Sequence, residues 1–139
     1  MNATKALLRL LRLAARWGVW IQGAYYLANG LWALVAIASF QAVTGPKTDI
    51  WLVKTVGLLL AVIGLVLLLA ASRRRVALQT TVLGGGTALA LIGIELVYVF
   101  NGTIAAVYLL DTVLEACFLA GWLYRWVSGA LNARGVSPS

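Results

Sequence analysis

The chain has 139 residues, of which 63% are hydrophobic and 11% are charged, and its formal net charge is +7. Soluble domains usually carry about 25% charged residues, so this composition excludes a water-exposed globule and indicates a membrane protein with one domain over residues 1–139. The positive charges flank apolar runs instead of forming a solvated basic surface, which argues against a nucleic-acid partner and for contact with membrane lipids.

The N-terminal segment carries basic side chains at helical spacing, at Lys5, Arg9, Arg12 and Arg16. Steps of four, three and four residues place them on one face of a helix. This pattern predicts a short basic amphipathic helix over residues 4–16 that lies at the lipid head groups. The alternative is that the first membrane span begins early and its arginines extend to the head groups.

Four long apolar runs follow, and each has about the 20 residues that a bilayer-crossing helix needs. The connections between them are short and polar. Short connections make consecutive helices antiparallel, so the sequence predicts an all-α, polytopic, up-down four-helix bundle in the membrane. The predicted membrane helices span residues 17–40, 50–71, 76–100 and 104–126.

Small residues mark the places where these helices should pack closely. Gly57, Ala61 and Gly64 form a stripe along the second run, which predicts close approach of another helix. The run Gly84-Gly85-Gly86 in the third apolar segment is interpreted in the same way. Asp49 directly precedes the second run and is expected to cap that helix.

The basic residues also predict the orientation of the bundle. All of them except Lys47 and Lys54 lie next to one end of the predicted bundle. The positive-inside rule therefore predicts a multi-pass protein of the inner (plasma) membrane with both termini in the cytoplasm. The residues expected to contact lipid head groups are Lys5, Arg9, Arg12, Arg16, Arg73, Arg74 and Arg75.

Four charged side chains lie inside the apolar runs, namely Lys54, Glu95, Asp111 and Glu115. A charge at the centre of a membrane helix costs about 2.5–3.5 kcal/mol, so these residues should face the bundle interior and have partners. Asp111 and Glu115 are four residues apart and share one helical face. At about 1.5 Å per residue, all four charges fall in the half of the bundle away from the cytoplasm. We therefore predict a polar cavity in this outer half, with Asn29 at its floor.

The candidate ligand-binding residues combine these charges with polar and aromatic side chains on inward-facing stripes. They are Glu115, Asp111, Glu95, Lys54, Asn29, Tyr25, Tyr98, Tyr108 and Trp32. Three carboxylates against one lysine leave a negative excess, so either a carboxyl is protonated or the cavity holds a cation or a cationic ligand. The aromatic residues would suit a flat apolar molecule or a cation. In a purely structural interpretation, Lys54 neutralises Glu95 or Asp111, and the polar residues fix the order of the helices.

These features leave several functions open. The first is binding of a small lipophilic or cationic ligand, the second is proton- or cation-coupled transport, and the third is a packing subunit of a homodimer or larger membrane complex. Carboxylates could also transfer protons in a dry cavity, as in an isomerase acting on a lipophilic substrate. The single cysteine, Cys117, cannot form an intrachain disulfide, and the absence of histidine excludes histidine-held haem or zinc. We therefore expect no cofactor and no metal.

One segment of the chain resembles a known family. Residues 44–57, with the sequence TGPKTDIWLVKTVG, resemble a segment of small bacterial four-span membrane proteins, and residues 107–115 are similar to their last span. The resemblance implies a four-span membrane fold and places the Gly-Pro-Lys-Thr-Asp segment in the site or in a lid over it, but it implies no particular activity. A fainter likeness of fold links the chain to EXPERA (sterol-isomerase-like) proteins, which hold acidic residues in an intramembrane ligand cavity.

Overall fold

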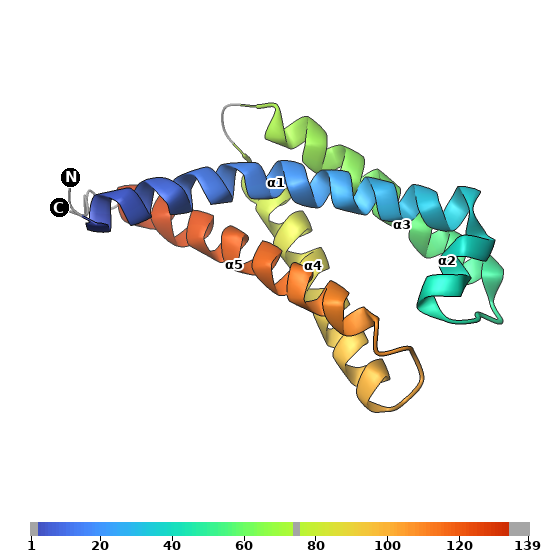
Figure 1. Ribbon diagram of the computed structural model, residues 1–139. Helices are drawn as coiled ribbons and strands as arrows, with labels where there is room; N and C mark the ends of the chain where they lie inside the picture. The colour runs from blue at the N-terminus through green and yellow to red at the C-terminus, as the bar shows by residue number, and fades with distance from the viewer. Residues whose placement is uncertain (1–2, 74–75, 134–139) are drawn as a thin grey trace.

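The computed structural model describes the backbone of residues 3–73 and 76–133, and this part of the chain is helical with no strand (Figure 1). The all-helical fold class is therefore confirmed. The helices are α1 (Ala3–Val35), α2 (Ile37–Thr44), α3 (Ile50–Ala71), α4 (Leu78–Phe100) and α5 (Tyr108–Ala133).

The helices pack as two antiparallel pairs. Helix α1 lies along α3 and α4 lies along α5, whereas contacts between α1 and α5 and between α3 and α4 are fewer. Figure 1 shows the two pairs diverging toward the end that holds α2 and the connection between α4 and α5. This divergence leaves space between the pairs at that end, and the candidate site lies there.

Glycine allows α1 and α3 to touch through their backbones. A Cβ atom added to Gly30 would lie 2.3 Å from the carbonyl oxygen of Gly57, and one added to Gly64 would lie 2.5 Å from the backbone nitrogen of Leu27. No side chain fits at such distances. The expected close approach along Gly57, Ala61 and Gly64 is therefore confirmed, and α1 is the partner.

Two of the helices are suited to a membrane by length and composition. Among the described residues, α3 and α4 are each long and apolar enough to cross a bilayer. The bent pair Trp17–Val35 and Ile37–Thr44 supplies a third candidate if it is counted as one span. Helix α5 is not among these candidates and carries Asp111, Glu115 and Arg125 along its length.

The N-terminal segment differs from the expected separate helix. Helix α1 runs without interruption from Ala3 to Val35, because no proline or turn sequence separates the basic segment from the apolar run. The basic segment and the apolar run thus form one helix, and the position of the head groups along it stays a prediction. Arg73 is exposed, and the other side chains expected at the head groups lie outside the described residues: Lys5, Arg9, Arg12, Arg16, Arg74 and Arg75.

The expected span over residues 17–40 is broken at Ala36. Helix α2 leaves the direction of α1 at an angle of 112°. The segment from Ala33 to Phe40 contains neither proline nor glycine, so nothing in its composition predicted this bend. A hydrogen-bonded link spans the bend: the indole N–H of Trp32 donates to the Ser39 hydroxyl at 2.8 Å, and that hydroxyl donates to the carbonyl oxygen of Ala36 at 2.9 Å.

The remaining helix ends follow the sequence pattern with small shifts. Helix α3 covers residues 50–71 as expected, and Asp49 occupies its N-cap position without a capping bond from the side chain. Helix α5 begins at Tyr108 instead of residue 104 and continues to Ala133. Gly45 and Gly102 adopt positive φ angles of 88° and 70°, which L side chains rarely adopt, at the ends of α2 and α4.

Candidate binding site

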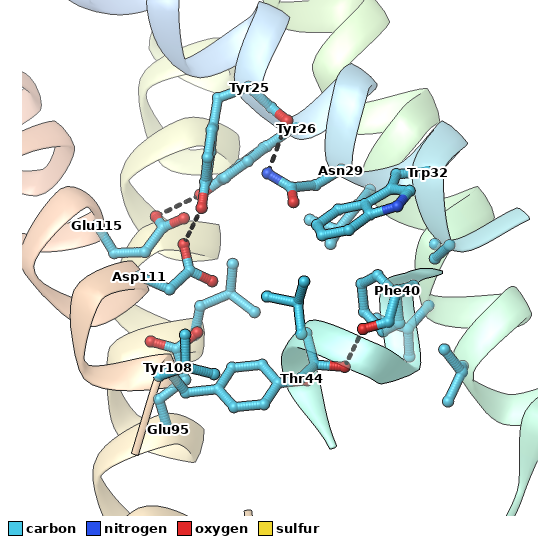
Figure 2. A pocket seen from close by; sticks show the side chains of 18 of the residues that line it. Tyr25, Tyr26, Asn29, Trp32, Phe40, Thr44, Glu95, Tyr108, Asp111 and Glu115 are labelled. Atoms are coloured by element: carbon cyan, nitrogen blue, oxygen red, sulfur yellow. Dashed lines mark hydrogen bonds between the residues drawn. The ribbon is translucent and has the colours of Figure 1, made fainter. Parts of the chain in front are cut away.

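A cavity of about 440 Å³ lies between the two helix pairs. Its walls come from all five helices and from the loop after α2, and most of the lining is apolar (Figure 2). Polar groups are concentrated where α4 and α5 face α1. The residues used in the argument below are Tyr25, Tyr26, Asn29, Trp32, Thr44, Lys47, Leu60, Glu95, Tyr108, Asp111 and Glu115.

Two adjacent tyrosines of α1 connect it to two carboxyl groups of α5. The Tyr25 hydroxyl donates to Oδ1 of Asp111, and the Tyr26 hydroxyl donates to Oε2 of Glu115 at 2.6 Å (Figure 2). Asp111 and Glu115 are one helical turn apart, so neighbouring side chains on a crossing helix can reach both. The two bonds therefore fix the register of α1 against α5.

Glu95 completes the group of carboxyls. It lies on α4, is only 4% exposed, and accepts a hydrogen bond of 2.8 Å from the hydroxyl of Thr112 to its Oε2 atom. Its carboxyl also lies close enough to Asp111 to interact with it. Each of the three carboxyl groups thus has one hydroxyl donor, and all three line the same cavity.

A buried chain of hydrogen bonds extends from Glu115 away from the cavity. The indole N–H of Trp122 donates to Oε1 of Gln22 at 2.6 Å. The Nε2 group of Gln22 donates to the Tyr26 hydroxyl and to the carbonyl oxygen of Gly84, both at 3.0 Å. Gln22 is fully buried, and its amide oxygen and nitrogen are both bonded. These hydrogen bonds therefore connect α1, α4 and α5.

Glycine on α4 makes room for Trp122. A Cβ atom at Gly84 would lie 2.5 Å from the Trp122 ring, and one at Gly85 would lie 3.4 Å from the Trp122 Cβ. The expectation of close packing in the triple-glycine run is met at these two positions, whereas nothing lies within 4 Å of a Cβ at Gly86. Gly84 thus has two roles: its carbonyl oxygen accepts a hydrogen bond from Gln22, and the absence of a side chain leaves space for the Trp122 ring.

The loop after α2 supplies a cation at the side of the cavity. Nζ of Lys47 donates to the carbonyl oxygen of Thr44 at 2.8 Å and lies 5.3 Å from the centre of the Tyr108 ring. The backbone N–H of Lys47 donates to Oε1 of Gln41 at 2.9 Å. Burial lowers the pKa of the Lys47 amine because it removes water from the charged form.

The structure brings together most of the sequence-predicted site residues. Those that line the cavity are Glu115, Asp111, Glu95, Asn29, Tyr25, Tyr108 and Trp32. Asn29 is half-buried, and its Nδ2 donates to the backbone carbonyl of Tyr25 at 3.1 Å. The expected convergence of the carboxyls from two helices is thus observed.

Two predicted residues lie elsewhere. Lys54 is exposed and does not line the cavity, so the expected pairing with Glu95 or Asp111 is wrong. Helix α1 meets Gly57 through Ala33 and ends at Val35, and Lys54 lies about one turn before Gly57 on α3. Tyr98 of α4 is 43% exposed and also lies outside the cavity.

Sequence reasoning missed part of the site. Thr112 directly follows Asp111, and it was not assigned to the inward face of its helix, although its hydroxyl donates to Glu95. Gln22 and Tyr26 form an i, i+4 pair on one helix, and the hydrogen bond between them was not predicted. Lys47 belongs to the Gly-Pro-Lys-Thr-Asp segment, which the resemblance places in the site or in a lid, and the structure shows that Lys47 lines the cavity.

The carboxyl groups are not arranged as a metal site. No group of three histidine, cysteine, aspartate or glutamate side chains in the described part of the chain is placed to hold a metal ion. The chemistry available in the cavity is therefore hydrogen bonding, charge and aromatic contact. Comparison of the chain with protein-family models, with curated proteins and with solved structures finds no match.

Proposed function

We propose that the chain is an integral membrane protein in which α1, α3, α4 and α5 all cross the bilayer. The support is an inverted distribution of polarity. Gln22 and Glu115 have no exposed surface, whereas Leu59 is 58% and Val113 62% exposed. Apolar side chains facing outward around a polar interior are stable in lipid and unfavourable in water.

Helix α5 fits this arrangement although its composition is less apolar. Asp111 and Glu115 point into the cavity and have tyrosine partners, so they do not face lipid. Its outward positions, among them Val113 and Leu123, are apolar. A helix with paired charges on its inner face can cross a bilayer as part of a bundle.

The function that we propose is binding of a small lipophilic molecule in the cavity between the helix pairs. The observation that carries this proposal is the cavity itself, which is mostly apolar and has a few polar groups gathered on one wall. Such a combination is typical of small-molecule sites, where apolar walls supply affinity and a few polar groups orient the ligand.

The test is to fill the cavity with a side chain. Leu60 of α3 lines the cavity, whereas its neighbour Leu59 is exposed and does not. We expect Leu60→Trp to weaken binding of biphenylmethanol, a small flat apolar alcohol, by at least about tenfold, because the indole occupies the same space. Isothermal titration calorimetry on the protein in detergent micelles measures the affinity.

The control is Leu59→Trp, which adds the same side chain on the outward face. This variant should bind biphenylmethanol as the wild type does. Equal binding by both variants, with both eluting as folded protein, would place the ligand outside the cavity and contradict the proposed function. Native mass spectrometry of the wild type should also detect a retained small molecule or lipid.

A further inference from the structure

The buried chain of hydrogen bonds that ends at Glu115 has a fixed direction. The indole N–H of Trp122 can only donate, and the backbone carbonyl of Gly84 can only accept. Gln22 bonds to both, so its amide oxygen must face Trp122 and its amide nitrogen must face Gly84. The same nitrogen donates to the Tyr26 oxygen, and the Tyr26 proton is therefore left for Glu115.

Because of this direction, Glu115 is the final acceptor in this series of hydrogen bonds. Its Oε2 atom receives the Tyr26 proton, and its Oε1 atom has no hydrogen-bond partner in the part of the chain that the structure describes. The side chain has no exposed surface and lines the cavity. Buried polar atoms almost always have a partner, so an unpartnered carboxyl oxygen at a cavity wall points to a ligand group.

The neighbouring hydroxyl groups donate to other acceptors. The Tyr25 hydroxyl donates to Asp111 and the Thr112 hydroxyl donates to Glu95. Lys47, the cation that lines the cavity, donates to the carbonyl of Thr44 and contacts the Tyr108 ring. The wall around Glu115 thus presents carboxyl oxygens to the cavity, and its complement is a donor that carries positive charge.

We propose that Oε1 of Glu115 binds the protonated amine of a lipophilic ligand whose apolar body fills the rest of the cavity. This inference rests on the proposed function and names the chemical class of the ligand. An ammonium group has several N–H donors, so it can serve Glu115 and the neighbouring Asp111 together. The rings of Tyr25 and Tyr26 also line this wall and favour a cation over an anion.

The experiment compares two probes that differ in one group. Biphenylmethylamine and biphenylmethanol share the same apolar body, but only the amine is positively charged at neutral pH. Charge-assisted hydrogen bonds are roughly twice as strong as neutral ones, so the wild type should bind the amine at least about tenfold more tightly. Isothermal titration calorimetry at neutral pH measures both dissociation constants.

Glu115→Gln should remove this preference. The variant keeps the size of the side chain and loses its charge, so its dissociation constants for the two probes should differ by less than about twofold. The control is Asp49→Asn, which makes the same change at an exposed carboxylate outside the cavity. This control should keep the full preference for the amine.

A measurement on the wild type keeps the test independent of how the variant folds. A lipophilic carbodiimide activates a carboxyl group, and a bound primary amine then forms an amide with it and releases the corresponding urea. Peptide mapping by mass spectrometry should locate the biphenylmethylamine adduct at Glu115. An adduct confined to the exposed Asp49 would overturn the proposal.

The outcomes test the amine proposal and the proposed lipophilic binding function separately. Equal affinity of the wild type for the two probes, or a full amine preference in Glu115→Gln, would overturn the amine proposal while leaving a lipophilic binding site. Absence of binding by both probes would instead count against the proposed function. Amine preference that is lost in Glu115→Gln and kept in Asp49→Asn supports both.

Discussion

Tyr25 and Tyr26 are adjacent in the chain, and their hydroxyls donate to two different carboxyl groups. Each tyrosine brings one hydroxyl from α1 to one carboxyl of α5. The carboxyls that occupy the cavity were predictable, because a charge within an apolar run must face inward. Tyr25 was also predicted to line the cavity, but the pairing of each hydroxyl with its carboxyl was not predictable, since a tyrosine or threonine is compatible with lipid, cavity or core.

Trp122 is the residue on which the direction of this network depends. It is 4% exposed, and its indole N–H donates to the amide oxygen of Gln22. We predict that Trp122→Phe lowers the free energy of unfolding by about 1–3 kcal/mol, because it leaves the buried Gln22 oxygen without a donor. Unfolding of the protein in mixed micelles by increasing sodium dodecyl sulfate measures the change.

A matched control is available on the same helix. Trp126 is 61% exposed, so Trp126→Phe should change the free energy of unfolding by no more than about 0.5 kcal/mol. Comparable losses in the two variants would mean that tryptophan in general, and not the bond to Gln22, stabilises α5.

At the scale of the helix, the bend between α1 and α2 is stabilised by contacts between side chains of the two helices. Composition predicted one helix over residues 17–40, since nothing in it disfavours a helix, but the helix is broken at Ala36. The bend depends on side chains that come together only after the chain has turned, when the Trp32 indole reaches Ser39 and its ring meets Phe40 edge-on at 5.3 Å between centroids. Local propensity carries no information about such a contact.

We predict that Ser39→Ala loosens this bend. The variant removes both the acceptor for the Trp32 indole and the donor to the Ala36 carbonyl. Spin labels at the exposed positions Leu31 and Val43 report the angle, because a straight helix would separate them by about 18 Å and a bent one brings them closer. Double electron–electron resonance should show a broader distribution shifted to longer distances.

Ser72→Ala is the control for this measurement. Ser72 also donates to a backbone carbonyl, that of Leu69, but it lies at the far end of α3. This variant should leave the distance distribution unchanged. An unchanged distribution in Ser39→Ala as well would show that the packing of α2 holds the bend without the hydroxyl.

At the scale of the whole molecule, small residues decide which helices pair. The stripe on α3 predicted close approach, but nothing in the sequence named α1 as the partner. The glycines of α1 that meet it, Gly23 and Gly30, lie seven residues apart on one face. Pairing requires both faces, so it follows from the structure and not from either stripe alone.

The proposed function depends on how many helices cross the membrane. Helices α3 and α4 have the composition of membrane spans, and the bent pair of α1 and α2 supplies a third. Three crossings would place the two termini on opposite sides of the membrane. Four crossings, with α5 included, place both on the side where the basic residues gather, as the positive-inside rule requires.

We therefore predict that a green fluorescent protein fused after Ser139 is fluorescent in a bacterial host, because four crossings would place that terminus in the cytoplasm. Alkaline phosphatase fused at the same position should be inactive. Fused after Gly102, between α4 and α5, alkaline phosphatase should be active, because four crossings would place that connection on the outer side. An active phosphatase at both positions would mean that α5 does not cross the bilayer. In that case Asp111 and Glu115 would meet α1 outside the lipid, and the cavity could not receive its ligand from the membrane.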